Sequence, residues 1–421
     1  MKILKYKINP KEMLVFLLIA AVPFSNYNIN IGFAVKPFMI MSVIAFIYYL
    51  SDFMNFASNK SLTINLFERR FLLFIILFSS TIVLAEYKLN SLRLIFGFVI
   101  VMFSYLMFKY SFKQVSIECI TKSVYLVGII FNITSLLLYL AGVVSVNFNF
   151  HGNQFTSFGL MLDRNVPRLI GVHSDPNFFV FYNLIFLSIF IYFKKSKLRF
   201  LWIALSMLNV LLTMSRSGII AVSVMLTIII ISSPIVKSIK SMRFKANTWI
   251  KIILAIIVTI IIIVTTITVL DIDLFSSIIA RFKTKDGGSG RVRLVQNGIE
   301  MFKQSGYLGI GIYNFQPMNV EMFQMQHYMH NTIMEVFVEG GIIVFGVYIY
   351  SLLTLMKMAL SIAKFDRRMN YLFATLIGSI VMMTTLSMII NEMLMLIFVL
   401  INVYFESMNE VESDCDAPMS Q

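Results

Sequence analysis

The sequence contains little charge. Asp, Glu, Lys and Arg together make up 13% of its 421 residues, whereas soluble globular chains average about 25%. Hydrophobic residues account for 58% of the chain, and the mean hydropathy is +0.84. A chain with so few solvated groups cannot cover its surface with polar side chains, so most of that surface must face lipid. The composition therefore argues against a soluble globular protein.

Cysteine is also scarce. Cys119 and Cys415 are the only two, and they do not have the spacing of metal ligands. This scarcity argues against a disulfide framework or a cysteine-based metal site. The first residues are rich in lysine and precede an apolar run, but no cleavage site of the A-x-A kind follows. We therefore interpret that run as an uncleaved first span and not as a signal peptide.

The sequence has instead long continuous apolar runs, such as 252–270. A membrane-spanning helix needs about 20 such residues, so the chain length predicts an all-α polytopic membrane protein with about twelve transmembrane helices. No internal repeat or low-complexity linker is evident, and we expect residues 1–421 to form a single multi-span membrane domain. The predicted spans lie at 12–25, 31–51, 71–86, 93–110, 123–146, 176–193, 198–214, 217–235, 248–270, 332–358, 369–389 and 392–406.

The net charge is +14, from 35 Lys and Arg against 21 Asp and Glu. In a soluble protein this excess would suggest nucleic acid as a partner, but in a membrane protein it is first explained by the enrichment of Lys and Arg in cytoplasmic loops. With the N-terminus inside, every predicted inner loop is basic. We therefore expect both termini to be cytoplasmic, with an acidic tail at 407–421, and no nucleic-acid partner. The inner-loop cations include Lys60, Arg69, Arg70, Lys109, Lys113, Lys122, Lys194, Lys195, Lys197, Arg199, Lys237, Lys240, Arg243, Lys245, Lys357, Lys364, Arg367 and Arg368.

Two of the predicted outer segments are long: a medium loop at 147–175 and a large loop at 271–331. Both are rich in arginine, although cytoplasmic enrichment does not explain cations on this side. All four histidines of the chain also lie there. Solvation on a loop would account for any one of these charges, but the whole cluster favours anion binding. We therefore expect the chemistry of the protein on the non-cytoplasmic side of the membrane.

The medium loop ends in a helix start next to an unexplained arginine. Pro176 suits the first turn of a helix, and Asp175 is a residue that can cap it. Arg168 has no capping role. Arg216 lies in the short turn before the span 217–235, where it could reach lipid headgroups. Lysine would suit that purpose equally well, whereas the planar fork of arginine fits phosphate.

A glycine-rich stretch at 287–290 precedes Arg291 and Arg293. Glycines allow backbone N–H groups to converge on an anion, although this stretch lacks the Lys-Ser/Thr ending of a nucleotide-binding loop. The residues that follow, from Leu294 to Phe302, predict a short amphipathic helix lying on the membrane.

The segment 327–341 combines groups suited to proton transfer. His330 has a side chain that titrates near neutral pH. Asn331, Glu335 and Glu339 fall on one helix stripe, and carboxylates at such depth should face protein or a wet cavity. Thr332 and Glu335 also fit a capping box, which would give Glu335 a structural role instead.

Several short motifs together resemble the O-antigen polymerase and O-antigen ligase superfamily of bacterial envelopes. Their order and their placement on one side of the membrane carry the resemblance. The motifs are Arg168-x-x-Gly171 followed by Asp175-Pro176-Asn177; Ser215-Arg216-Ser217-Gly218; Ser289-Gly290-Arg291; Gly309-Ile310-Gly311; and His330-Asn331 followed by Gly340-Gly341 and Gly346.

The resemblance implies a bacterial inner-membrane glycosyltransferase that needs no metal or other cofactor. Its donor would be an undecaprenyl-diphosphate-linked oligosaccharide, held beside membrane lipid. Its product would be O-antigen, capsule or a related surface polysaccharide. A chain-length regulator and a flippase of the same pathway would be partners. We favour a polymerase; the alternatives are a ligase that moves the finished polymer to the lipid A core and a flippase for lipid-linked sugars.

The resemblance and the residue chemistry together indicate a candidate site. Arg216 and Arg291 would clamp the diphosphate, and His330 or Glu335 would activate the acceptor hydroxyl. Further candidates for substrate binding are Arg168, Arg293, Asp175, Asn177 and Asn331.

Overall fold

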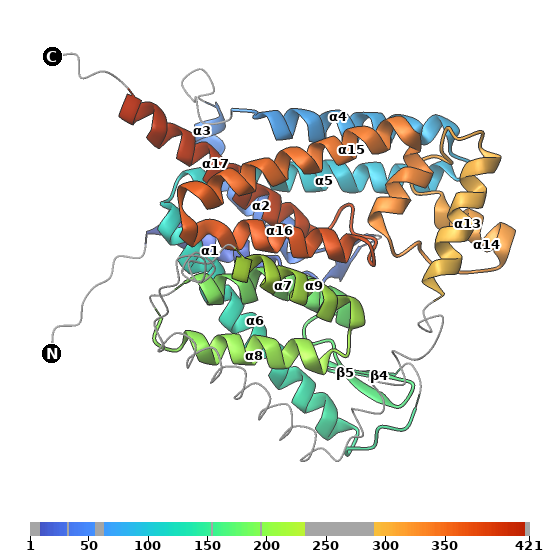
Figure 1. Cartoon of the computed structure of the whole chain (residues 1–421), viewed down its shortest axis with the longest axis horizontal. Coiled ribbons are helices and arrows are strands. Elements are labelled where there is room, and N and C mark those ends of the chain that lie inside the picture. The colour runs from blue at the N-terminus through green and yellow to red at the C-terminus, as the bar shows by residue number, and fades with distance from the viewer. Residues whose placement is uncertain are drawn as a thin grey trace. The chain divides into compact units, whose positions relative to one another are not determined.

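The computed structural model describes residues 9–31, 33–54, 63–152, 155–193, 196–231 and 290–416 (Figure 1). The predicted span 248–270 and most of the glycine-rich stretch at 287–290 lie outside these residues. The chain divides into two compact units. The first comprises Met1–Gly128, Arg293–Leu376 and Met383–Gln421, and the second comprises Ile129–Val292 and Ile377–Met382.

The first unit is built mainly of helices. α15 packs along α4 and α17, and α5 packs against α17 and α2 (Figure 1). Its elements, some of which reach the second unit, are α1 (Pro10–Ala21), β1 (Ile29–Asn30), β2 (Ala34–Val35), α2 (Pro37–Tyr48), α3 (Leu50–Met54), α4 (Leu66–Ser80), η2 (Thr81–Leu84), α5 (Lys88–Lys113), the start of α6 (Ile117–Ser145), α13 (Arg291–Gln304), α14 (Phe315–Phe323), α15 (Thr332–Phe365), η3 (Arg367–Met369), α16 (Asn370–Met383) and α17 (Glu392–Asp416).

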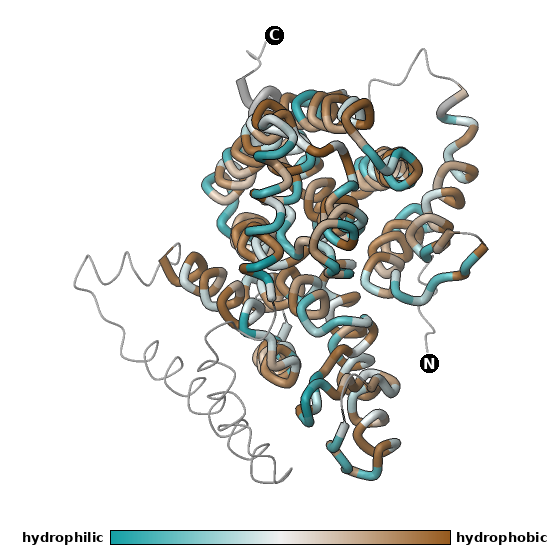
Figure 2. Tube along the Cα trace, turned by 90° about the vertical axis from the view of Figure 1, so that its right-hand side faces the viewer, coloured by the Kyte–Doolittle hydropathy of each residue, from teal (hydrophilic) through white to brown (hydrophobic). Residues whose placement is uncertain are grey.

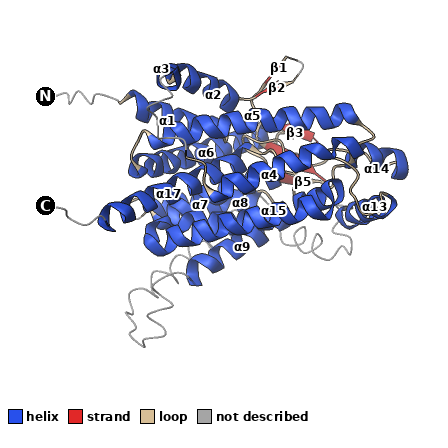
Figure 3. Ribbon diagram, turned by 90° about the horizontal axis from the view of Figure 1, so that it is seen from above, coloured by secondary structure: helices blue, strands red, loops and turns tan. Residues whose placement is uncertain are grey.

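The described part of the second unit contains the rest of α6, part of α16, three short strands and the helices α7 (Pro176–Tyr192), α8 (Arg199–Leu212) and α9 (Arg216–Ile231). Figure 3 distinguishes helices and strands by colour. The strands β3 (Phe155–Ser157), β4 (Leu160–Asp163) and β5 (Val166–Leu169) form an antiparallel sheet. Strand β4 turns into β5 through Arg164 and Asn165, which both have positive φ, as a tight two-residue hairpin requires. The fold is thus mostly but not purely helical. The all-α prediction from the sequence did not include this sheet.

Every predicted span that falls within the described residues contains a helix. Among the residues that the structure describes, four helical segments are long and apolar enough to cross a membrane: α5, α6, α15 and the part Glu392–Glu410 of α17. Hydrophobic residues predominate along much of the helical trace (Figure 2). The structure therefore supports a multi-pass helical membrane protein, whereas the number of twelve spans stays a prediction.

Buried asparagines tie the helices of the second unit together. Asn132 on α6 donates to Asn183 on α7 at 3.0 Å, and Asn209 on α8 donates to the Asn132 side chain at 3.0 Å. All three side chains are fully buried. Interhelical hydrogen bonds of this kind hold membrane helices in register where lipid offers no hydrophobic driving force.

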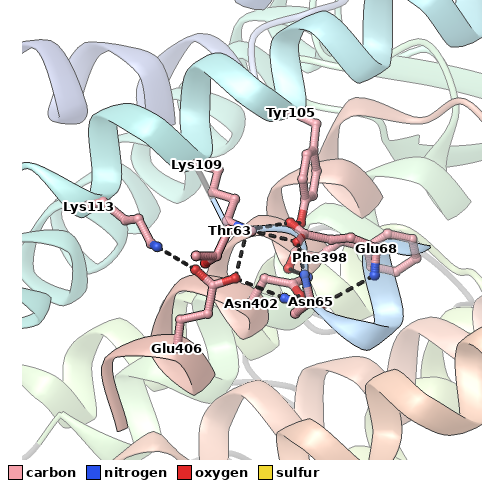
Figure 4. A network of polar contacts seen from close by, with 9 residues as sticks. All are labelled: Thr63, Asn65, Glu68, Tyr105, Lys109, Lys113, Phe398, Asn402 and Glu406. Carbon is pink, nitrogen blue, oxygen red and sulfur yellow. Dashed lines mark hydrogen bonds and ion pairs between the residues drawn. The ribbon is translucent and has the colours of Figure 1, made fainter. Parts of the chain in front are cut away.

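A buried ion network joins three helices of the first unit (Figure 4). The Lys109 ammonium on α5 lies 2.7 Å from Glu68 Oε1 on α4 and 2.7 Å from Glu406 Oε1 on α17. It also donates to the Thr63 carbonyl at 2.7 Å. Lys113, one turn further along α5, lies 2.6 Å from Glu406 Oε2. Two cations thus face two carboxylates, so the network neutralises charge that would be costly to bury alone.

Local structure positions the carboxylate of Glu68 within this network. Asn65 caps α4 by accepting from the Glu68 N–H at 3.1 Å, and Glu68 accepts from the Asn65 N–H at 2.8 Å. Tyr105 donates to Glu68 Oε1 at 2.6 Å. The sequence reading had assigned Lys109 and Lys113 to an inner loop on the basis of topology alone. Both residues lie in the last two turns of α5 and not in a loop, and their charges are matched inside the protein; their side of the membrane stays a prediction.

We expect replacement of Lys109 by methionine to destabilise the protein strongly. The change leaves Glu68 and Glu406 buried without their shared cation, and removing one partner of a buried pair typically costs about 3–5 kcal/mol. The matched control is Lys122→Met. Lys122 pairs with Glu118 at 3.3 Å, but its side chain is 56% exposed, and exposed helix pairs contribute only about 0.3–0.5 kcal/mol. Thermal unfolding of the detergent-purified variants tests this: similar losses in the two variants would contradict it.

Candidate functional site

The N-terminus of α7 is held by Asp175. Its Oδ1 accepts from the N–H groups of Asn177 at 2.7 Å and Phe178 at 3.2 Å, and Pro176 occupies the first helical position. The predicted helix start is confirmed. The same oxygen also accepts from the Asn177 side-chain amide at 3.0 Å. Asn177 is therefore oriented by Asp175, and its side-chain oxygen is turned toward other partners.

The turn between α8 and α9 is anchored to that helix start. Ser215 Oγ donates to Asn177 Oδ1 at 2.6 Å and accepts from the Gly218 N–H at 3.0 Å, which caps α9. A Cβ at Gly218 would lie 2.8 Å from a methyl group of Val180. Glycine is thus required for the close approach of α9 to α7. Arg216 is the first residue of α9. The contact between Ser215 and Asn177 therefore keeps it beside the N-terminus of α7.

Arg168 supports this turn from the sheet. Its Nε donates to the Thr213 carbonyl at 3.0 Å, and its Nη1 donates to Asp163 Oδ2 at 3.1 Å. Asp163 and Arg168 face each other diagonally across the β4–β5 hairpin. Only 9% of Arg168 is exposed. Its guanidinium therefore holds the chain three residues before Arg216, which is a positioning role that the sequence reading did not foresee.

Arg291, the first residue of α13, belongs to the same group of charges. Burial lowers the pKa of its guanidinium below the ordinary value, the Asp175 carboxylate opposes this shift, and the Arg216 guanidinium adds to it. Arg291 is therefore partly buried and close enough to Asp175 and Arg216 to feel both charges. The second unit thus brings together Arg216, Arg291, Asp175 and Asn177, which the sequence had separated by more than a hundred positions.

This cluster has the chemistry of an anion site. Arg216 and Arg291 are each the first residue of a helix, where free backbone N–H groups and the helix dipole favour negative charge. Guanidinium groups add forked, charge-assisted hydrogen bonds to phosphate oxygens. Two such groups in one partly buried place suit a ligand with more than one negative charge, such as a diphosphate.

A second group of candidates lies in the first unit, at the start of α15. Asn331 caps this helix, since its Oδ1 accepts from the Met334 N–H at 3.0 Å. The predicted capping box of Thr332 and Glu335 was wrong. Thr332 is turned instead to another segment: its hydroxyl donates to the Leu386 carbonyl at 2.6 Å and accepts from the Met388 N–H at 2.9 Å. His330, just before the cap, has a left-handed backbone with φ 52°.

Glu335 is freed from capping and is buried. Only 6% of the residue is exposed, and its Oε2 meets no donor at hydrogen-bond distance among the described residues, although the Ser387 hydroxyl is near enough to interact with the carboxylate. A buried carboxylate oxygen without a partner is costly, so it indicates a place where a proton or a ligand hydroxyl is expected. The structure therefore keeps Glu335 as a candidate for proton transfer.

Glu339 has a structural partner instead. Its Oε2 accepts from the Tyr313 N–H at 2.8 Å, and its Oε1 accepts from the Phe315 N–H at 3.0 Å. These bonds fix the segment 308–315, here called the strap, against α15. The strap also donates from Ile310 and Gly311 to the carbonyls of Val338 and Glu339. One carboxylate thus satisfies the backbone at the start of α14.

Two glycine positions make this contact possible. Gly341 interrupts α15 with φ 77° and ψ 177°, and a Cβ there would lie 2.4 Å from the Leu308 carbonyl oxygen. Gly309 has φ 99°, and its Cβ would lie 2.7 Å from the Glu339 carbonyl oxygen. Both glycines belong to the motifs quoted from the sequence. Glycine is needed at these two positions because the backbone of the strap lies in close contact with the kink of α15.

Helix α13 does not rest its apolar side on lipid as predicted. Leu294, Met301 and Phe302 are buried in a core that also includes Phe315 and Met329. This core fastens α13 and α14 to the start of α15 in the first unit. Arg293 is exposed on α13, so of the two arginines that open this helix it is Arg291 that enters the cluster.

Sequence reasoning missed several residues that matter here. Asp163 lies five residues before Arg168, and the turn residues between them could have revealed the hairpin. Ser215 was quoted only as a motif residue. Tyr313 and Tyr328, whose rings stack on each other, carried no signal in the sequence. Within the described ranges, no three His, Cys, Asp or Glu side chains are grouped as in a metal site.

We expect Gly341→Ala to impair the protein and Gly346→Ala to be tolerated. Both changes add one methyl group to α15. At Gly341 the backbone has positive φ and the new Cβ would overlap the Leu308 carbonyl, whereas nothing lies within 4 Å of a Cβ at Gly346. Alanine also favours a regular helix over glycine by about 1 kcal/mol. Folded yield and thermal stability of the purified variants are the measurements, and equal behaviour of the two variants would refute the proposed strap contact.

A comparison with known protein families matches a region that contains several of these candidate residues. Residues 200–349 match the model of the family described as O-antigen ligase. The match includes Arg216, Arg291, His330 and Glu335, whereas Arg168 and Asp175 precede it. No curated protein matches the chain. The match at residues 200–349 confirms the resemblance to the O-antigen polymerase and ligase superfamily that the motifs carry.

Proposed function

We propose that the protein is a glycosyltransferase that polymerises undecaprenyl-diphosphate-linked oligosaccharide repeat units into O-antigen or a related surface polysaccharide. The reaction would take place on the outer face of the bacterial inner membrane, with both termini of the chain in the cytoplasm. Members of the superfamily are enzymes that act on polysaccharide. The observation that carries the proposal is the cluster of Arg216, Arg291 and Asp175 in the second unit.

The arginine cluster suits the leaving group of such a transfer. The bond between the anomeric carbon of the donor saccharide and the diphosphate oxygen breaks, and the diphosphate takes the electron pair. Negative charge therefore develops on the bridging oxygen. Preorganised guanidinium groups in a poorly hydrated place stabilise that charge without reorganising. Arg216 and Arg291 would supply this stabilisation, and Arg168 would keep the α8–α9 turn in the required position.

The acceptor side of the reaction needs a group that takes a proton. A hydroxyl of the acceptor sugar forms the new bond to the anomeric carbon and loses its proton to a base. Two candidates follow each other at the start of α15. His330 has the side chain whose unperturbed pKa lies closest to neutral, and Glu335 has a buried oxygen without a partner among the described residues. Asn331 caps the helix that carries Glu335.

The other candidate residues have different supporting roles in this proposal. Asp175 and Asn177 shape the N-terminus of α7 beside the arginines. Arg293 is exposed on α13 and is proposed to meet substrate before it enters the site. A flippase that delivers the lipid-linked repeat and a chain-length regulator are proposed as partners of the same pathway. Transfer without a metal or other cofactor is part of the proposal.

The family match fits a ligase as well as a polymerase. A ligase would use the same donor but would transfer the finished polymer to the lipid A core. The lipopolysaccharide band pattern of a deletion strain distinguishes them. Loss of a polymerase leaves a single repeat on the core, whereas loss of a ligase leaves the core bare and the polymer on its carrier lipid. Transport of lipid-linked sugars without any change in polymer length would favour a flippase.

Arg216→Ala and Arg291→Ala should each reduce polymer formation about 100-fold or more, because removing one preorganised donor to a developing anion costs about 10²–10³ in rate. The control is Arg93→Ala, since Arg93 is an exposed arginine near the predicted outer end of α5. Polymer length is measured in a deletion strain that expresses each variant at the same membrane level. Wild-type polymer from both Arg216→Ala and Arg291→Ala would refute the diphosphate clamp.

Purified protein tests the class of reaction directly. Incubation with its undecaprenyl-diphosphate-linked repeat unit should give a ladder of longer products, and EDTA should leave the ladder unchanged. A single transfer that requires added lipid A core would instead identify a ligase. Absence of any product from a folded preparation with both acceptors would overturn the proposal.

A further inference from the structure

Two tyrosines beside the start of α15 form a pair that the reaction described above does not use. The rings of Tyr313 and Tyr328 stack with their centroids 6.1 Å apart and an interplanar angle of 25°. Their hydroxyl groups lie 3.1 Å from each other. Tyr328 is 38% exposed, whereas Tyr313 is half-buried. The pair therefore presents an aromatic surface with two hydroxyl groups together at its rim.

The backbone of the pair is held rigidly. Tyr313 has a left-handed conformation with φ 58°, which is unfavourable for a bulky residue and persists only where surrounding contacts enforce it. Its N–H donates to the buried Glu339 carboxylate at 2.8 Å. The next residue, Asn314, accepts from the Tyr87 N–H at 2.7 Å and donates to Ser91 at 2.9 Å. The strap is thus tied to both α15 and α5.

Tyr328 is fixed from the other side. Met329, the residue after it, is fully buried in the core that joins α13, α14 and α15. His330 then turns the chain with φ 52° before Asn331 caps α15. Since the candidate proton acceptors begin two residues after Tyr328, the ring is attached directly to the segment that carries them. Strained, well-anchored residues of this kind gather at functional places more often than elsewhere.

The Tyr313 side chain feels the charge of two buried carboxylates. Burial raises the pKa of Tyr313 well above its ordinary value, and the hydrogen bond to Tyr328 and the charges of Glu335 and Glu339 raise it further. The Tyr313 side chain is therefore within electrostatic reach of Glu335. Glu335 has a buried oxygen with no donor at hydrogen-bond distance among the described residues, and Ser387 is a polar neighbour of its carboxylate. An aromatic surface thus adjoins a buried carboxylate.

We infer that Tyr313 and Tyr328 form a sugar-binding platform that holds the acceptor saccharide beside Glu335 and His330. A pyranose ring has an apolar face of C–H groups and a rim of hydroxyls. The aromatic rings match the face, the tyrosine hydroxyls match the rim, and a sugar hydroxyl can donate to Glu335 Oε2. Binding sites combine apolar and aromatic walls with a few placed polar groups in this way. The inference rests on the proposed function, because it assigns the acceptor of that transfer to this part of the first unit.

The platform predicts that the ring of Tyr328 contributes more to saccharide binding than its hydroxyl group does. Removing the ring of Tyr328 removes the stacking surface, whereas removing its hydroxyl removes one hydrogen bond. We therefore expect Tyr328→Ala to weaken saccharide binding about tenfold, which corresponds to about 1.4 kcal/mol. Tyr328→Phe should weaken it only about threefold, as the loss of a single hydrogen bond does. The control is Tyr27→Ala, since Tyr27 is also exposed, at 56%, but belongs to another segment.

The probe is the lipid-free oligosaccharide released by mild acid from the repeat unit of the producing strain. Titration of the full-length protein in lipid nanodiscs, followed by saturation-transfer NMR, measures its dissociation constant. Thermal unfolding verifies that each variant is folded. Support requires binding by the wild type and the Tyr27 control, with the graded losses in the two Tyr328 variants. Wild-type binding by folded Tyr328→Ala, or no binding by the wild-type protein, overturns the platform.

A parallel transfer assay separates this result from the proposed function. If the wild-type protein makes polymer from the lipid-linked repeat while Tyr328→Ala binds saccharide and makes polymer normally, the platform is wrong and the function stands. If the wild-type protein binds the saccharide through Tyr328 but makes no transfer product, the proposed reaction is wrong and the binding site stands.

Discussion

The structure around the start of α15 in the first unit depends on the Glu339 carboxylate. It accepts the N–H groups of Tyr313 and Phe315, and through them it fixes the strap, the start of α14 and the left-handed backbone of Tyr313. A buried charge is tolerated in such a place only when donors surround it. The helix stripe that carries Glu339 also carries Glu335 one turn earlier. The same stripe therefore supplies one carboxylate that is satisfied by the fold and one that is open to chemistry.

The same rule operates at the other buried charges and separates structural from functional groups. Lys109 is matched by Glu68 and Glu406, and Arg168 is matched by Asp163 and the Thr213 carbonyl. Arg291, by contrast, feels one carboxylate, Asp175, and another guanidinium, Arg216. A cluster in which two cations share the influence of an aspartate suits an anionic ligand.

Glycine and proline positions connect the motifs to these charges. Pro176 begins α7, Gly218 lets α9 approach it, and Gly341 lets the strap lie on α15. Each of these residues lies within a few positions of a candidate functional side chain. The short motifs quoted from this sequence therefore combine a backbone requirement with a neighbouring polar side chain. Changing the glycine is expected to displace that side chain.

The sequence by itself indicated where the described apolar helices lie and where α7 begins, because continuous apolar runs and the Asp175–Pro176 cap act over a few neighbouring residues. It also indicated the family through the order of its motifs. It did not indicate α14. Only the tertiary structure decided that Asn331 and not Thr332 caps α15, that Lys109 lies in a buried network, and that Arg168 braces the turn before Arg216. Those outcomes depend on partners such as Leu386, Glu406 and Asp163, which meet these residues only after folding. Neighbouring residues in the sequence do not indicate which distant residues a side chain will contact. The roles of Thr332, Lys109 and Arg168 were therefore decided only by packing.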